Sequence, residues 1–262
     1  MKILITGSRS GIAFLTGITL ASRGHFVYMT THTLKEAHEL KKKVNRYNYK
    51  IIVFRLDVTN ADDRKILDTL DIDVLINHAG IGVGGSVLDL PLEELKRNFE
   101  VNYFYSYDIV KKVVNKMIKN NKEGRIIITS SIAGTIPIPF LGSYCSSKSA
   151  ISTMATSLRG ELKTIKSKIK IILIEPGAYK TGFNQVMIDD IDKNTNSDSV
   201  FFNEKDKIHN NLTNIFNLTE KKKLNSIVIK IIEAVESPNP RSKYSAPFFQ
   251  RIFAKIYMLF CK

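Results

Sequence analysis

Short apolar runs alternate with longer helical patterns along the first two thirds of the chain, and this alternation restricts the fold more than any other feature. Strand-like runs are expected at residues 2–6, 26–30, 51–56, 74–77, 125–129 and 169–175. Helical patterns lie between them, at residues 12–23, 34–46, a short stretch ending at 70, 91–119 and 143–167. Such alternation predicts βαβ units and a parallel sheet. Several runs are apolar throughout, which indicates a doubly wound sheet with helices on both faces.

The size of the chain fits one large domain followed by a short tail. With 262 residues, of which 44% are apolar, the chain can bury a single core without splitting into several domains. We expect one α/β domain over residues 1–246, completed by a helix at 222–236 and an edge strand at 242–246. Residues 247–262 would form a separate tail.

The segment 183–220 differs in composition from the rest of the domain. It is rich in Asn and Asp, yet it also carries large apolar residues, namely Phe183, Met187, Phe201, Phe202 and Phe216. Loops of this length in compact domains are usually functional or disordered. We therefore expect a mobile lid, whose aromatic residues favour a fairly apolar ligand.

The net charge of +14, from 39 basic and 25 acidic residues, raises the question of a nucleic-acid or anionic-membrane partner. The lysine clusters at 41–43, 111–112 and 221–223 lie on or beside expected helices, where a solvated helix face explains them. The sequence carries no nucleic-acid-binding signature. We therefore expect no nucleic-acid partner.

Cysteine usage and the start of the chain indicate a compartment. Cys145 and Cys261 lie far apart and lack metal-ligand spacing, so we expect no disulfide framework and no metal site. An apolar run begins almost at Met1, which leaves no room for a cleavable leader. No run reaches the ~18 apolar residues that would span a bilayer. These features predict a cytoplasmic protein in a reducing compartment.

A glycine-containing turn follows the first expected strand. The run TGSRSGIA, at residues 6–13, leads from that strand directly into a helix. Glycines at such a turn let the backbone approach a pyrophosphate, and the helix N-terminus supplies unpaired N–H groups and a positive dipole. A plain glycine turn could look the same in isolation. Its position between a strand and a helix favours a dinucleotide site.

The end of the second expected strand bears on the choice of dinucleotide. Thr30, Thr31 and His32 stand where the adenosine ribose would lie. A carboxylate there would accept hydrogen bonds from the ribose 2′-hydroxyl and repel a 2′-phosphate, and none is present. With Arg9 in the glycine turn and His32 nearby, the local charge favours NADP(H), with NAD(H) as the open alternative.

Further polar motifs follow the later strands in order. They are Asp57-Val58, Asn77-His78-Ala79-Gly80, Ser130-Ser131, the pair Tyr144 and Lys148 in SYCSSK, and Pro176-Gly177 with Thr181. Together with the glycine turn, these motifs make the chain resemble a short-chain dehydrogenase/reductase over roughly residues 1–182. The resemblance implies a single-domain, Rossmann-type fold with the cofactor lying across the carboxyl ends of the strands.

The resemblance also implies which residues act. It assigns catalysis to Asn102, Ser131, Tyr144 and Lys148. A second Tyr-x-x-x-Lys pair, Tyr107 with Lys111, does not fit the pattern, because Glu94 rather than a serine stands thirteen residues before Tyr107.

The residues that the resemblance assigns to the cofactor belong to the glycine turn, to the ends of strands or to the catalytic pair. They are Gly7, Ser8, Arg9, Ser10, Gly11, Ile12, Thr31, His32, Asp57, Val58, Asn77, Ala79, Gly80, Tyr144, Lys148, Pro176, Gly177 and Thr181. Thr181 would bond the nicotinamide carboxamide, and Asp57 with Val58 would contact the adenine.

Two residues depart from the family pattern. Ala13 replaces the third glycine of the loop and adds a methyl group where the helix packs closely on the sheet. His78 replaces the commoner second asparagine and could titrate near neutral pH. We expect neither change to prevent binding or chemistry, since Asn77, which would tie neighbouring strands together, is intact.

These residue types suit hydride exchange between a nicotinamide and a carbonyl or secondary alcohol. A free tyrosine has a pKa of ~10, too high for efficient proton exchange at neutral pH. The ammonium of Lys148 and the oxidised nicotinamide would favour the ionised phenol of Tyr144. Ser131 would orient the substrate oxygen, Lys148 would also grip the cofactor ribose, and Asn102 would hold a water that connects Lys148 to solvent.

The sequence thus predicts an oxidoreductase that acts on a fairly apolar carbonyl or alcohol, in a homodimer or homotetramer. The alternative is a non-catalytic nucleotide-binding protein that serves as a sensor or scaffold. The intact set of Ser131, Tyr144 and Lys148 argues against that alternative, because a chain without catalysis would not need all three residues.

The tail, residues 247–262, reads PFFQRIFAKIYMLFCK and is amphipathic as a helix. Its apolar face would carry Phe249, Ile252, Phe253, Ile256 and Phe260. Gln250, Arg251 and Lys255 would lie off the centre of that face. The face could pack on the chain's own substrate cleft or on a second subunit, or it could lie in a membrane interface as a peripheral contact. A disordered tail is the remaining alternative.

Overall fold

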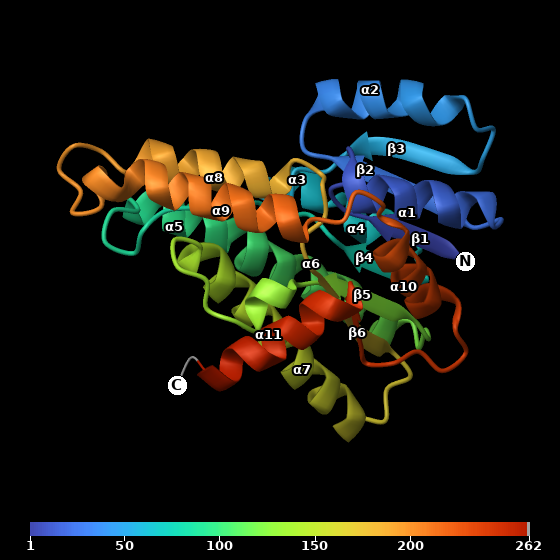
Figure 1. The fold of residues 1–262 in the computed structure, drawn as a ribbon. Coiled ribbons are helices and arrows are strands. Elements are labelled where there is room, and N and C mark those ends of the chain that lie inside the picture. Colours follow the sequence, from blue (N-terminus) through green and yellow to red (C-terminus); the bar gives the residue numbers. More distant parts are fainter. Residues whose placement is uncertain (261–262) are drawn as a thin grey trace.

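A seven-stranded parallel sheet forms the centre of the protein, as seen in a computed structural model that describes residues 1–260 (Figure 1). Its strands are β1 (Lys2–Ile5), β2 (Phe26–Thr31), β3 (Ile51–Arg55), β4 (Val74–Asn77), β5 (Arg125–Thr129), β6 (Lys170–Pro176) and β7 (Lys243–Ala246). The order across the sheet is β3-β2-β1-β4-β5-β6-β7, and all neighbours are parallel. The order reverses between β1 and β4, which leaves a crevice at their carboxyl ends. The predicted doubly wound sheet is confirmed.

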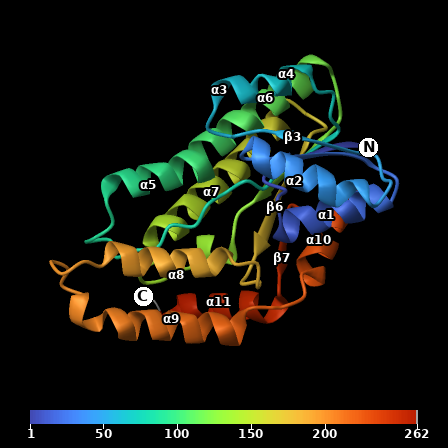
Figure 2. The same cartoon turned by 90° about the horizontal axis from the view of Figure 1, so that it is seen from above.

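Helices cover both faces of the sheet (Figure 2). One face packs against α1 (Gly11–Ser22), α2 (Leu34–Asn45) and α10 (Asn225–Glu236). The other packs against α4 (Ile66–Thr69), α6 (Tyr105–Lys119) and α7 (Gly142–Thr164), with the single turn α3 (Ala61–Arg64) beside α4. Along β1 the side chains alternate, because Ile3 and Ile5 join the first core while Leu4 joins the second. Two covered faces explain why the strands are apolar throughout.

The close contact between α1 and the sheet lies one turn later than expected. Ala13 is buried in the core and its methyl group is accommodated there. At Gly17, by contrast, a Cβ atom would fall 2.8 Å from the sulfur of Met29 on β2. The substitution of alanine for the third glycine of the turn therefore leaves the packing of α1 intact.

The helix expected over residues 91–119 is continuous but irregular. It consists of α5 (Leu92–Phe99), one π-helical turn η1 (Glu100–Phe104), and α6. Single π-helical turns inside helices often mark functional positions. Asn102 lies in this turn.

The segment 183–220 is helical, and our interpretation of it as a long loop is wrong. It forms α8 (Phe183–Asn194), the short turn η3 (Phe202–Glu204) and α9 (Lys205–Thr219), which project from the sheet as a hairpin (Figures 1 and 2). Met187, Ile188 and Ile191 recur at helical spacing and are buried against Leu212 of α9. The high content of Asn and Asp concealed this apolar stripe.

The tail forms the predicted helix, α11 (Phe248–Phe260), but with a different side inward. Ala254 is buried and Gln250 is half-buried, whereas Phe249, Ile252, Phe253 and Ile256 are exposed. Of the alternatives for this face, burial within the chain is wrong for Phe249, Ile252 and Ile256, whereas Phe253 is exposed but lines the cleft. Packing on a second subunit and contact with a membrane remain predictions. The side chain of Phe260, assigned to the same face, and residues 261–262, including Cys261, lie outside the described residues. Within the described part of the chain, no helix has the length and apolar character needed to cross a membrane.

Candidate active site

A cleft of about 1460 Å³ opens along the carboxyl ends of the strands. Its wall begins at the glycine turn, passes the ends of β3, β4 and β5, and continues between α8, α9 and α11. Most predicted site residues contribute to this wall, and along the chain they run from Gly7 to Thr181. The cleft is large enough to hold a dinucleotide and a substrate side by side.

Two glycines of the turn are required by close contacts. Gly7 has a φ of +68°, and a Cβ atom there would lie 2.8 Å from the Cα of Ala79. Gly11 has a φ of +62°, and a Cβ atom there would lie 3.2 Å from the side chain of Thr181. The turn can therefore pack against the loops after β4 and β6 only without side chains at these positions.

The N-terminus of α1 has the features of an anion site. Ser10, Gly11 and Ile12 line the cleft, and the first turn of the helix carries no acidic residue. The Ser10 side chain makes no capping hydrogen bond, so amides of the first turn are available to a ligand. These residues fit the pyrophosphate of a nicotinamide dinucleotide.

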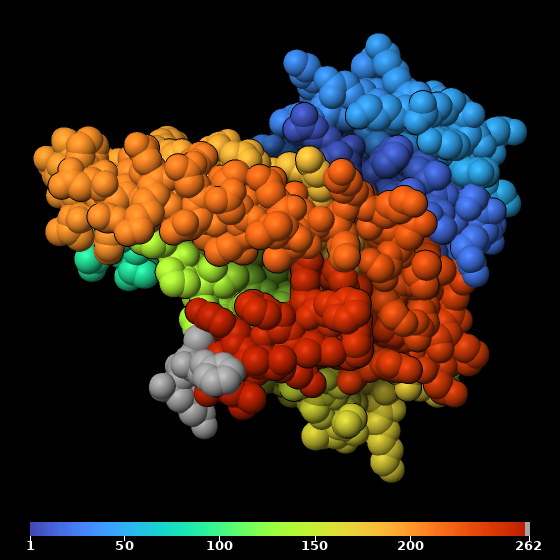
Figure 3. All heavy atoms as spheres, in the orientation of Figure 1, coloured from blue at the N-terminus to red at the C-terminus, as the bar shows by residue number. Residues whose placement is uncertain are grey.

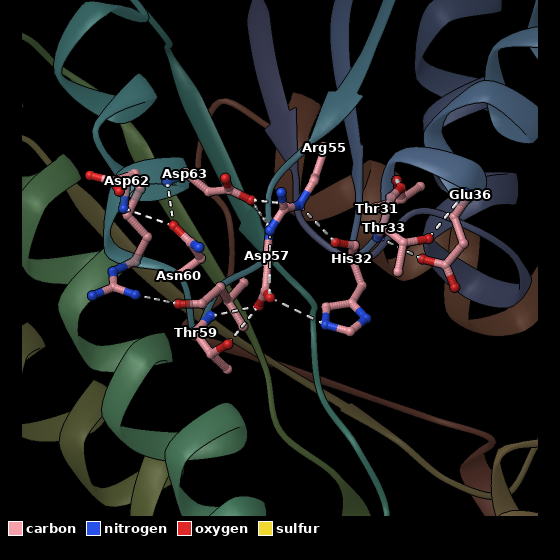
Figure 4. Close-up of polar contacts among 12 residues, drawn as sticks. Thr31, His32, Thr33, Glu36, Arg55, Asp57, Thr59, Asn60, Asp62 and Asp63 are labelled. Carbon is pink, nitrogen blue, oxygen red and sulfur yellow. Dashed lines mark hydrogen bonds and ion pairs between the residues drawn. The ribbon is translucent and has the colours of Figure 1, made fainter.

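Charged groups at the adenosine end are paired with one another (Figure 4). His32 lies 3.3 Å from the carboxylate of Asp57, and Arg55 lies 3.1 Å from Asp63. Arg9 of the glycine turn bonds Glu36 at 2.9 Å, and the Glu36 side chain also caps α2 through the backbone of Thr33. Glu36 and Arg55 had no role in the sequence analysis. Arg55 could have been found as the basic residue that ends β3.

Asp57 is held ionised by its neighbours. Burial would raise the pKa of its carboxyl, but hydrogen bonds from Thr59 and the positive charges of His32 and Arg55 lower it below the ordinary value. The hydroxyl and the amide of Thr59 both donate to one oxygen of Asp57, at 2.8 and 2.9 Å. The loop after β3 is therefore fixed where Asp57 and Val58 reach the cleft.

The structure brings Ser131, Tyr144 and Lys148 together at the end of β5. The Ser131 hydroxyl is near enough to the phenol of Tyr144 to influence its pKa, and the Lys148 ammonium lies 5.8 Å from the centre of the Tyr144 ring. The ammonium donates to the carbonyl of Thr129 at 3.2 Å, while Ser130 donates to the Lys148 carbonyl at 2.9 Å. Helix α7 is thereby fixed to the end of β5.

The protonation states of this pair are set by burial. Tyr144 is 8% exposed and Lys148 is 4% exposed. Burial raises the pKa of Tyr144 to about 12, although the hydrogen bond from Ser131 opposes this shift. Burial lowers the pKa of Lys148 to about 8. The expected lowering of the Tyr144 pKa by Lys148 is thus absent in the protein alone, because desolvation of the phenol outweighs it.

Asn102 lies behind the cleft wall and is held by several partners. Its carboxamide pairs with the backbone of Ile81, with both hydrogen bonds at 2.9 Å, and it also bonds Asn98 and Ser147. A Cβ atom on Gly80 would lie 3.0 Å from the Asn102 oxygen and 3.2 Å from the Lys148 nitrogen. Asn102 and Lys148 therefore meet around Gly80. Asn98, one helical turn before Asn102, was not predicted as a site residue. Its four-residue spacing from Asn102 was the signal that could have identified it.

The loop after β4 is tied to neighbouring elements as expected. The Thr6 hydroxyl donates to Asn77 at 3.3 Å and accepts from the amides of His78 and Ala79. His78 contacts Thr129 through Nδ1 at 3.1 Å. Burial, together with the charge of Lys148, lowers the pKa of His78 to about 4. The expectation that His78 titrates near neutral pH is therefore wrong.

Four predicted residues do not form part of the cleft wall: Ser8, Thr31, Asn77 and Asn102. The Ser8 hydroxyl donates to the carbonyl of Ile5, and the Thr31 hydroxyl donates to that of Thr33. Asn77 donates to Ser106 on α6. These side chains shape the loops around the cleft, and His32 rather than Thr31 faces the adenosine end.

The far end of the cleft is apolar. Phe183 packs 5.5 Å from the Tyr144 ring, measured between ring centres. The same cluster contains Met187 of α8 and Leu212 of α9, with Ile138 and Phe140 from the loop before α7. Because Tyr144 belongs to this cluster, a molecule bound beside its ring would contact mainly apolar side chains.

Gln250 of α11 connects three segments of the site and was not predicted. Its amide oxygen accepts from the Ala178 amide at 2.7 Å, and its nitrogen donates to the Thr219 carbonyl at 2.7 Å. A Cβ atom on Gly177 would collide with the Gln250 amide, so a side chain there would displace Gln250 from this position. The sequence pattern placed Gln250 off the inner face of the helix, so no signal indicated this role.

The fold and the cleft define a dinucleotide-binding α/β protein with a buried serine, tyrosine and lysine beside an apolar pocket. The family model described as short chain dehydrogenase matches residues 1–192. The chain therefore belongs to the short-chain dehydrogenase/reductase family, whose members are nicotinamide-dependent oxidoreductases.

Relatives and solved structures agree with this assignment. The chain is 31% identical to a 3-ketodihydrosphingosine reductase of Bacteroides thetaiotaomicron, over 97% of this chain and 90% of that protein. It is 29% identical to an NADPH-dependent 3-dehydrocapnine reductase of Ornithobacterium rhinotracheale, over 68% of this chain and 65% of that protein. A short-chain dehydrogenase/reductase of Burkholderia phymatum, solved in complex with NAD, has the same fold with a TM-score of 0.83 and 19% identity. That likeness covers 98% of this chain and 92% of the other.

The depressed pKa of Lys148 predicts a pH dependence of stability. Unfolding restores the ordinary pKa of 10.5, so between pH 8 and pH 10 the unfolded state binds more protons at this position and stability rises with pH. In cofactor-free protein, the free energy of unfolding of wild type relative to Lys148→Met should rise by ~1–3 kcal/mol from pH 7 to pH 10. Denaturant titrations at several pH values measure this. Lys111→Met, at an exposed lysine, serves as the control, and its stability relative to wild type should not change with pH. If the stability difference between wild type and Lys148→Met also stays constant from pH 7 to pH 10, the prediction is contradicted.

The contacts of Gln250 predict an effect on binding more than on chemistry. Gln250→Ala removes hydrogen bonds worth ~0.5–1.5 kcal/mol each, so KM for the cofactor and for the substrate should rise by about three- to tenfold. The value of kcat should change less than twofold, because the reacting groups remain in place. Gln185→Ala, which removes an exposed bond to Asp189 on α8, is the matched control. Equal KM values for both variants would exclude this role of Gln250.

Proposed function

We propose that the protein is an NADP(H)-dependent reductase of an apolar ketone. The observation that carries the proposal is the joint burial of Ser131, Tyr144 and Lys148 beside an apolar pocket. A sensor or scaffold would need the nucleotide end of the cleft alone. The presence of Ser131, Tyr144 and Lys148 together argues for an enzyme, because nucleotide binding alone would not require all three.

In the proposed reaction, the neutral phenol of Tyr144 protonates the developing alkoxide. A bound reduced nicotinamide would supply the hydride. Because the pKa of Tyr144 is about 12 in the protein alone, its proton is present at neutral pH, which is the form that reduction requires. Ser131 would hold the carbonyl oxygen, and Lys148 would hold the ribose and stabilise the tyrosinate left after transfer. Asn102 would keep Lys148 linked to solvent through a water.

The remaining cofactor contacts follow from the cleft wall. The N-terminus of α1 would bind the pyrophosphate, and Thr181 would bond the nicotinamide carboxamide. Arg9 and His32 would contact a 2′-phosphate, because both side chains are exposed and line the cleft beside the ends of β1 and β2. The phosphate would have to compete with Glu36 for Arg9. The relative named as NADPH-dependent supports this choice.

The substrate class is inferred from the pocket and the relatives. Phe183, Met187 and Leu212 would contact a long apolar chain. A 3-ketodihydrosphingosine, the compound named for the Bacteroides relative, combines such a chain with a ketone. A long-chain ketone is therefore the substrate class that we propose for this protein.

The assembly is proposed to be a homodimer or homotetramer in the cytoplasm. Phe104 and Tyr107 are exposed on the helix that contains the π-helical turn, beside a shallow depression that is lined by Tyr103 of that turn and by residues of α7. A second copy covering these residues would remove apolar surface from water.

Tyr144→Phe tests the proposed chemistry. Turnover should fall by ~10²–10⁴ because the proton donor is lost, while cofactor affinity stays within about threefold because the ring remains. The measurement is loss of reduced-cofactor absorbance with a long-chain ketone, and a fluorescence titration gives cofactor affinity. Tyr107→Phe should be nearly silent. Turnover of Tyr144→Phe within tenfold of wild type would reject the proposed mechanism.

The cofactor preference is tested at Arg9 and His32. Arg9→Ala with His32→Ala should weaken NADPH binding by about tenfold or more, since two charge-assisted contacts are lost. The affinity for NADH should stay within about twofold. Titrations with both reduced cofactors decide the matter, and Arg46→Ala, on the far end of α2, is the control. Tighter binding of NADH than NADPH to wild type would show that the preference is reversed.

A further inference from the structure

The outer face of α11 is apolar and open to solvent. We define this outer face as Phe249, Ile252, Phe253, Ile256 and Leu259, which recur at three- and four-residue steps. Phe249 is 77% exposed and Leu259 is 72% exposed. The helix is held to the protein through its other side, where Gln250 bonds Ala178 and Ala254 is 3% exposed. An amphipathic helix normally buries its apolar side, so this orientation indicates a further contact.

The apolar surface continues onto α9. Leu218 is 86% exposed, and the next residue, Thr219, accepts the hydrogen bond from Gln250. Figure 3 shows α9 and α11 side by side on one face of the molecule. Leu218 and Phe253 both line the cleft, so the cleft opens within this apolar surface.

Basic residues lie on α11 itself and in the two loops next to the Gln250 contacts, after β6 and after α9, and we call this set the basic rim. It consists of Lys180, Lys221, Lys222, Lys223, Arg251 and Lys255, all exposed. Lys180 and Lys221 are joined through a backbone hydrogen bond, directly after the end of α9. Within residues 1–260, no ion pair to a carboxylate involves a member of the rim. Glu220, in the same turn, is turned inward and accepts from Asn184.

We propose that the outer face of α11 and its basic rim dock on the surface of an anionic lipid bilayer. The helix would lie in the plane of the interface, with its apolar side chains among the acyl chains and the basic rim at the headgroups. Charge decides between a bilayer and a second copy of the chain. Two copies meeting through this face would bring two basic rims together, in a protein with a net charge of +14, and would repel each other. An anionic bilayer complements both the apolar and the basic groups.

This inference does not depend on the proposed reaction. The outer face and the rim are defined by exposure and charge, and Phe249 and Leu259 lie outside the cleft wall. Docking in this orientation would turn the mouth of the cleft toward the bilayer. An apolar substrate could then pass between the two without crossing water.

The test is flotation of the full-length protein with vesicles. Wild type should float with phosphatidylcholine vesicles that contain phosphatidylglycerol, should stay behind with pure phosphatidylcholine, and should be released by high salt. Phe249→Ser with Leu259→Ser should reduce the bound fraction by about tenfold or more. Lys222→Glu with Lys223→Glu should reduce it at low salt. Circular dichroism and thermal unfolding verify that each variant is folded.

Matched controls lie on α2, at the opposite end of the molecule from α11 (Figure 1). Leu34→Ser removes an equally exposed leucine, and Lys41→Glu with Lys42→Glu reverses an equal number of charges. Both controls should bind vesicles like wild type. The proposal fails if wild type does not float with anionic vesicles, or if the α11 variant floats as well as the Leu34 control. It also fails if light scattering shows a dimer that dissociates in Phe249→Ser with Leu259→Ser while no vesicle binding occurs.

Discussion

The burial of one ammonium group, on Lys148, organises the carboxyl ends of the strands. A charge that is 4% exposed is costly unless polar groups surround it, and here the Thr129 carbonyl provides a partner at 3.2 Å. The backbone segments that surround Lys148 must approach it closely. A Cβ atom on residue 134 would lie 2.9 Å from the Lys148 carbonyl, so a glycine stands there. A Cβ atom on residue 80 would lie 3.2 Å from the Lys148 ammonium, and Gly80 leaves that space open. Two glycines outside the dinucleotide turn are thus explained by the placement of a single side chain. The same low-dielectric surroundings keep Tyr144 protonated in the protein alone.

At the end of the cleft beside β2 and β3, the charged side chains are partly solvated. They are stabilised by pairing with one another rather than by hydrogen bonds in a buried site. Arg9 and His32 each lie beside a carboxylate, Glu36 and Asp57 respectively. Glu36 is also committed to the capping box that begins α2. In the proposed complex, cofactor choice would depend on whether a 2′-phosphate competes better for Arg9 than Glu36 does. A count of basic residues in the sequence could not include this competition.

The apolar half of the molecule depends on contacts between segments that are distant in sequence. Helices α8 and α9 pack on each other and on the start of α7 through Met187, Leu212 and Leu141. Gln250 then ties α11 both to the loop after β6 and to the end of α9. The loop that would meet the nicotinamide, the substrate pocket and the exposed tail helix are in this way one connected unit.

The sequence by itself determined the sheet, the family and the grouping of Ser131, Tyr144 and Lys148, because strand and helix periodicity are local and the motifs follow strand ends at fixed spacing. It also located α11 but not its orientation, since periodicity defines an apolar face without saying what covers it. The helices within 183–220 were missed because their polar residues masked a stripe that is recognisable only when Met187 and Ile191 meet Leu212. Tertiary structure alone decided that His78 is neutral, that Thr31 is turned away from the cleft and that Arg9 is paired. Each of these depends on burial or on a partner far along the chain, and neither quantity can be read from neighbouring residues.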